Sequence, residues 1–185
     1  MVAVIIVVAL LALVALIVIL AQNSMIAARN RVEEAWSGID VQLKRRHDLV
    51  PNLVETVKGY ATHEREVFER ATKARAEAMS ARSPGEAGQK EGQLTSALTD
   101  LRAVAENYPD LRATENFQQL SRQLTETEDE IQAARRIYNS NVQSYNTKIQ
   151  VFPNSMIASA RNFEAKEFFE ITDAADREPV QVSFS

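Results

Sequence analysis

The stretch RVEEAWSGIDVQLKRRHDLVPNLVETV, residues 31–57, decides the fold of this chain. Its apolar side chains recur every three or four residues, which is the period of one face of an α-helix and close to a coiled-coil heptad. The apolar stripe consists of Val32, Trp36, Ile39, Leu43, Val50, Leu53/Val54, Val57, Tyr60/Ala61, Val67/Phe68, Ala71, Ala74 and Ala78. It resumes on both sides of Pro51, so we predict a kink there rather than a helix end.

Upstream, residues 1–21 read MVAVIIVVALLALVALIVILA and contain no charged side chain. About 20 apolar residues span a bilayer as a helix. A cleaved signal peptide would carry a basic region before a shorter apolar core, and no basic side chain precedes this one. We therefore expect a retained transmembrane anchor that runs straight into the amphipathic helix. Basic residues follow the anchor at Arg29, Arg31 and 44–46, which predicts an outside N-terminus and a cytoplasmic C-terminal domain in the cell membrane.

Downstream, the first strong break is SARSPGEAG at residues 80–88. Ser83 and Glu86 form a capping-box pattern, which predicts a second helix from residue 84 to before Pro109. A third helix should run from about Thr114 to Pro153, and a shorter one from Ser155 to about Glu170. The expected fold is all-α: an anchor at 1–21, an antiparallel bundle of three long helices and a short one at 22–172, and a tail at 173–185. The alternating end, residues 179–185, could add as a strand, but a frayed terminus is the preferred interpretation.

Composition excludes several classes of function. The 185 residues carry a net charge of −4, and both signs mix along the helices, so a nucleic-acid partner is not expected. The chain has no cysteine and two histidines, so neither a thiolate zinc site nor a histidine-rich metal site is expected. His63-Glu64 begins like a zincin motif, but Val67 stands where the second histidine would be. We predict no metal, no cofactor and no enzyme activity.

Two groups of residues are candidates for interaction. Lys44, Arg45 and Arg46 could bind lipid headgroups or an acidic partner, although pairing with Asp40 four and five positions away is the preferred interpretation.

Tyr138 and Tyr145 lie one heptad apart on an apolar stripe, each followed by asparagine. They are expected to be core rings with partnered hydroxyls, and alternatively a polar layer or partner interface. Trp36 lies too far beyond the anchor for an interfacial belt, so it belongs to the core or an interface.

Four segments together resemble the LemA family of bacterial membrane proteins. They read RNRVEEAWSGIDVQLKRRHDLVPNLVETVKGYATHE (29–64), ENYPDLRATENFQQL (106–120), TEDEIQAARRIYNSNVQSYN (127–146) and VFPNSMIA (151–158). The resemblance implies a short external N-terminus, one membrane helix and an α-helical domain. Magnetosome proteins that organise a membrane resemble the same family. The family pattern usually has an apolar residue and a glycine before Phe163, whereas this chain has Arg161 and Asn162.

These observations lead to a non-enzymatic, single-pass membrane scaffold as the first functional hypothesis. Its partners would be the lipid bilayer, a second copy of the chain in a homo-oligomer, and possible other membrane proteins. The alternative is a monomeric accessory or sensor subunit of another membrane complex. A hydrolase with an unrecognised site is the third hypothesis, and it would require a bundle pocket with a strongly perturbed carboxylate pair.

Overall fold

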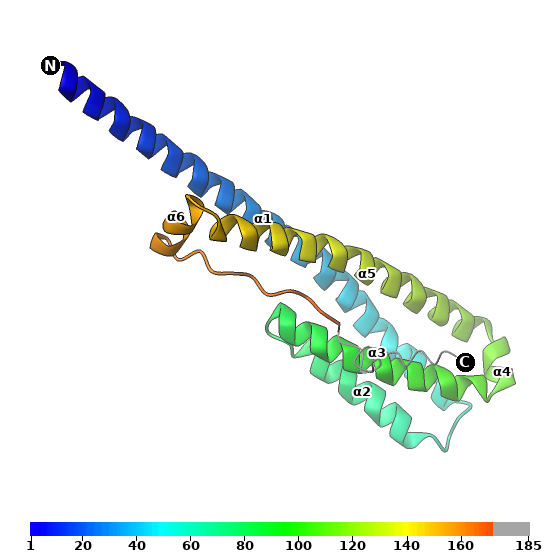
Figure 1. The fold of residues 1–185 in the computed structure, drawn as a ribbon. Helices are drawn as coiled ribbons and strands as arrows, with labels where there is room; N and C mark the ends of the chain where they lie inside the picture. Colours follow the sequence, from blue (N-terminus) through cyan, green and yellow to red (C-terminus); the bar gives the residue numbers. More distant parts are fainter. Residues whose placement is uncertain (172–185) are drawn as a thin grey trace, which may run out of the picture. The chain divides into compact units, whose positions relative to one another are not determined.

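The computed structural model describes residues 1–171 (Figure 1). In that range the chain forms six helices and no strand, so the predicted all-α class is confirmed. The helices are α1 (Val2–Lys58), α2 (Arg65–Met79), α3 (Pro84–Glu106), α4 (Pro109–Ala113), α5 (Glu115–Gln150) and α6 (Asn154–Ala160). The proposed strand at 179–185 lies outside the described residues.

The chain divides into two compact units. Unit 1 consists of Met1–Gly38 and Arg136–Lys166, and unit 2 consists, within the described residues, of Ile39–Arg135 and residues 167–171. Helices α1 and α5 contribute to both.

In unit 1, α5 runs antiparallel to α1. Asn141 Nδ2 donates to the Arg31 carbonyl over 3.3 Å, and Lys148 Nζ donates to Ser24 Oγ over 2.9 Å. Apolar faces of both helices meet between these contacts, and the buried residues are Met25, Ala28, Val32, Tyr138, Val142, Tyr145 and Ile149. The large side chains of residues 1–20 are exposed except for the partly covered Val18, and this part of α1 is long and apolar enough to cross a membrane.

In unit 2, α1 ends at Lys58 and the chain reverses through residues 59–64 into α2 (Figure 1). The expectation that one helix runs on to the break at Ser80 was therefore wrong. Gly59 costs a helix about 1 kcal/mol relative to alanine, which weakens the helix at this point. The stripe hid the reversal because Ala61 is buried within it and maintains the apolar spacing.

Pro51 lies inside α1 without ending it, as predicted. Proline has no N–H, so the carbonyl four residues earlier, on His47, loses its intrahelical donor. Arg75 Nε of α2 donates to that carbonyl over 2.6 Å. A side chain from the neighbouring helix thus replaces the missing backbone bond.

The predicted start of α3 with Ser83 as its N-cap is confirmed, but the Glu86 side chain bonds to the residue before the cap and not to Ser83 itself, so the reciprocal half of the capping box is shifted by one residue. Ser83 Oγ accepts from the Glu86 N–H over 3.3 Å, and Glu86 Oε2 accepts from the Arg82 N–H over 2.8 Å. The third predicted helix is also found, as α5.

The short C-terminal helix ends at Ala160, ten residues before its predicted end. Asn162 has a φ of 55°, in the left-handed region, and the Phe163 N–H donates to the Ala158 carbonyl over 3.0 Å. These two features are those of a Schellman cap. Residues 163–171 then continue without helix, and Phe169 is fully buried.

Candidate functional site

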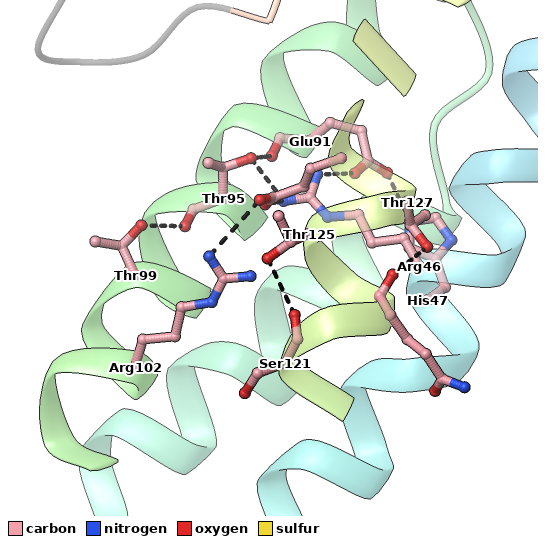
Figure 2. A network of polar contacts seen from close by, with 11 residues as sticks. Arg46, His47, Glu91, Thr95, Thr99, Arg102, Ser121, Thr125 and Thr127 are labelled. Atoms are coloured by element: carbon pink, nitrogen blue, oxygen red, sulfur yellow. Dashed lines mark hydrogen bonds and ion pairs between the residues drawn. The ribbon is translucent and has the colours of Figure 1, made fainter. Parts of the chain in front are cut away.

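A buried charge cluster in unit 2 is the main polar constellation of the described residues. It consists of Arg46 and His47 from α1, Glu91 and Thr95 from α3, and Glu128 from α5 (Figure 2). Figure 2 shows Arg46, Glu91 and Thr95 pointing toward one another from α1 and α3.

Arg46 is the centre of the cluster. Its Nη1 lies 3.1 Å from Glu91 Oε2, and its Nη2 donates to Thr95 Oγ1 over 2.8 Å and to Glu128 Oε1 over 3.1 Å. The side chains of Arg46 and Glu91 are each 1% exposed, whereas that of Glu128 is 28% exposed. One guanidinium therefore joins α1, α3 and α5.

Glu91 has both carboxylate oxygens engaged. Its second oxygen, Oε1, lies 2.6 Å from His47 Nε2. An ionised carboxylate can only accept, so the imidazole nitrogen is the donor in this contact. Glu128 also faces a second guanidinium, with Arg102 Nη1 at 3.7 Å.

The cluster does not satisfy every donor within the described residues. Arg46 Nε and Arg102 Nη2 are buried there without a hydrogen-bond partner. A cavity of about 320 Å³ borders Arg46, and its other lining residues are Thr95, Glu128, Ile131, Gln132, Arg135 and Ile171.

Chemically, the cluster is best suited to joining helices. A buried ion pair has a large desolvation cost, but removing one partner costs about 3–5 kcal/mol because the other charge is left uncompensated. Such a pair favours one helix register over others. No group of three or more His, Cys, Asp or Glu side chains that could hold a metal occurs in residues 1–171.

The three residues of the predicted basic cluster, 44–46, differ in their exposure to solvent. Arg46 is buried, so it offers no surface to a lipid or an acidic partner. Arg45 lies 3.7 Å from Glu130 with both side chains about half exposed, and Lys44 is exposed. In the described chain no ion pair joins Asp40 to Lys44 or Arg45, contrary to the preferred interpretation.

The aromatic candidates lie together in unit 1. The rings of Trp36 and Tyr138 are 5.3 Å apart and tilted by 58°. Tyr138 and Tyr145 are both buried, and the Tyr145 hydroxyl donates to the Glu164 carbonyl over 2.9 Å. Burial raises the pKa of the Tyr145 hydroxyl. The structure therefore places both tyrosines in the core of this unit.

Sequence reasoning missed His47, Glu91 and Glu128, although a signal was present. Each lies in a gap of an apolar stripe, between apolar residues seven positions apart. The flanking pairs are Leu43 and Val50, Ala87 and Leu94, and Leu124 and Ile131, all buried. A polar residue in the middle of such a gap faces the core, so three such gaps indicate a buried polar layer.

Several known proteins are similar to this chain in sequence. The chain is 25% identical over 180 residues to the magnetosome proteins MamQ 1 and MamQ 2 of Paramagnetospirillum magneticum, in alignments covering 83% of this chain and 66% of each relative. It is 28% identical over 156 residues to protein LemA of Metamycoplasma hominis, covering 82% and 70%. The chain thus spans just under two thirds of the MamQ proteins it matches. The model of the LemA family matches residues 35–184, a range that contains the whole buried charge cluster. The chain belongs to the LemA family.

Proposed function

We propose that this chain is a non-enzymatic, single-pass membrane protein that acts as a scaffold for assembly at the membrane. One observation carries the proposal: the exposed apolar residues 2–20 and the cluster residues Arg46 and His47 belong to the same uninterrupted helix, α1. The apolar segment and the packed part of α1 are therefore joined within one helix, with no linker residues between them.

The state of the cluster favours a structural role over catalysis. A general acid or base must reach a substrate. Glu91 is buried, and its two oxygens are engaged by Arg46 and His47. The magnetosome proteins among the relatives support a role in an assembly for this chain as well.

We propose that the scaffold assembles with copies of itself, but one observation favours a monomer instead. The apolar stripe of α1, which a second copy of the chain could cover, includes Val32 and Ile39, and each is buried within its own unit. A monomer that covers its own stripe needs no second copy. The monomeric accessory subunit therefore remains the second candidate.

Crosslinking of the full-length chain in native membranes separates the two candidates. A ladder of the chain with itself, together with a particle larger than one chain in mild detergent, is expected for the scaffold. A single chain crosslinked to a different membrane protein would favour the accessory subunit. A chain that is extracted by alkaline carbonate would contradict the membrane anchor itself.

A further inference from the structure

The α5–α6 turn, residues 151–156, comprises the three residues between the helices and the start of α6, and it exposes large apolar side chains. Val151, Phe152 and Met156 are 46%, 80% and 68% exposed, and they lie within six consecutive residues of unit 1. Exposed apolar side chains gathered in this way usually mark a contact surface.

The register of α5 on α1 places this turn beside the end of the apolar segment. Asn141 of α5 contacts Arg31 of α1, and Lys148, seven residues later on α5, contacts Ser24, seven residues earlier on α1. Two further residues, about 3 Å of helix rise, bring the end of α5 at Gln150 level with Gln22, and Phe152 lies in the turn that follows.

Burial along α1 agrees with this register. Every residue from Met1 to Ile17 is exposed, and the first partly covered side chains are Val18, Ala21 and Gln22. The turn therefore lies at the last helical turn of the segment that would cross the membrane.

Charge around the turn is complementary to an anionic lipid surface. Residues 131–163 contain no acidic side chain, and residues 1–32 contain none either. The basic side chains of unit 1 in these ranges are Arg29, Arg31, Lys148 and Arg161, together with Arg136, which lies about 18 Å of helix rise before Lys148 and away from the turn. Basic residues next to a membrane-spanning helix attract anionic headgroups.

We propose that the α5–α6 turn inserts Val151, Phe152 and Met156 into the interface of the bilayer that α1 crosses. The inference rests on the proposed membrane anchor and goes beyond it, because it assigns a second lipid contact to unit 1. The occupant is lipid because the turn ends level with the apolar segment, where hydrocarbon meets headgroups.

The absence of cysteine makes a direct test possible. Full-length single-cysteine variants Phe152→Cys, Met156→Cys, Ile137→Cys and Ile5→Cys are labelled with an environment-sensitive dye. They are reconstituted in vesicles of phosphatidylcholine and phosphatidylglycerol that carry spin-labelled lipids, quenching either near the headgroup or deep in the chains. Ile137 is the matched control, since it is 60% exposed, aliphatic and on α5, about 17 Å of helix rise before Lys148.

The expected result is emission at shorter wavelength for the probes at 152 and 156, with stronger loss from the shallow quencher than from the deep one. The probe at 137 should stay water-like and the probe at 5 should respond to the deep quencher. Water-like spectra at 152 and 156 with a quenched probe at 5 would overturn the interfacial contact and leave the anchor intact. Shielded but unquenched probes at 152 and 156 would assign the turn to a second copy. An unquenched probe at 5 would overturn the anchor and this inference together.

Discussion

Asn162 holds a left-handed backbone where the family pattern usually has glycine. Asparagine tolerates this region better than other side-chain-bearing residues, because its short polar side chain bonds locally. A β-branched residue at this φ of 55° should cost about 1–2 kcal/mol. We predict that Asn162→Val lowers the free energy of unfolding by this amount, while Asn162→Gly leaves it equal or higher. Urea unfolding in detergent micelles measures both, and Arg161→Val, at a cap position with φ of −112°, is the control. Equal stability of the two valine variants would contradict this account.

Glu91 should be the most sensitive position of the buried charge cluster. Glu91→Gln leaves the Arg46 charge without its buried partner, which should cost about 3–5 kcal/mol of unfolding free energy. Glu130→Gln removes the half-exposed pair with Arg45 and should cost at most about 1 kcal/mol. Chemical denaturation of the two variants makes the comparison. Equal losses would show that burial of the pair contributes nothing.

A charge-free replacement tests whether the cost comes from the uncompensated charge. The double variant Arg46→Met/Glu91→Leu removes both charges and keeps apolar volume. It should recover part of the stability lost in Glu91→Gln, because replacing both members of a buried ion pair is often near neutral. A double variant less stable than Glu91→Gln would contradict this explanation.

At Pro51, helix α1 depends on a bond supplied by α2. Arg75 donates to the His47 carbonyl that Pro51 leaves without a donor. Arg75→Met should therefore cost about 1–3 kcal/mol, the cost of an unsatisfied buried carbonyl. With Pro51→Ala the backbone N–H of residue 51 can fill that role, so the same Arg75 substitution should cost less. A double-mutant cycle on unfolding free energies measures the coupling. Additive effects would refute it.

The N-terminal end of α3 is held by an acidic side chain from the C-terminal segment. Hydrogen bonds from the Ser83 hydroxyl and the Gly85 N–H hold the pKa of Glu167 below its usual range. A carboxyl with a lower pKa in the folded state contributes stability above its unfolded pKa, about 4.3, and loses it as the pH falls through the folded value. Stability should thus fall between neutral pH and pH 3 more in the parent than in Glu167→Gln. Denaturation curves at both pH values test this, and identical pH dependence would contradict it.

The same segment passes directly over α3 at Gly88. A Cβ there would overlap the Glu170 carbonyl group, with the carbonyl carbon at 2.8 Å. Gly88 and Gly92 have the spacing of a small-residue helix-packing motif, but they lie in a polar stretch where that motif has no membrane role. The close approach of the Glu170 backbone explains why residue 88 is a glycine.

The helices could be predicted because their apolar periodicity is local, whereas the contacts between them are not. The capping pair Ser83 and Glu86 fixed the start of α3 within one turn of chain. The reversal at residues 59–64 was hidden by the buried Ala61, and the end of α6 by Phe163, Phe168 and Phe169, whose spacing resembles a helical stripe. The pairing of Arg46 with Glu91 could not be predicted from the sequence, because the two residues are 45 positions apart. The apolar stripe of one helix does not specify which other helix packs against it.

We predict the orientation of the chain in the membrane from the basic residues that follow the apolar segment. Arg29 and Arg31 lie within ten residues after Ala21. Lys and Arg near a span stay on the cytoplasmic side, while Asp and Glu have little influence, so Glu33 and Glu34 should not reverse the outcome. In sealed spheroplasts a C-terminal epitope tag should resist added protease and become sensitive after lysis. Inserting three lysines after Met1 should reduce that protection, since the charge bias then opposes the original orientation. Digestion of the tag in intact spheroplasts of the parent would place units 1 and 2 outside. Protection unchanged by the lysines would show that features other than flanking charge determine the orientation.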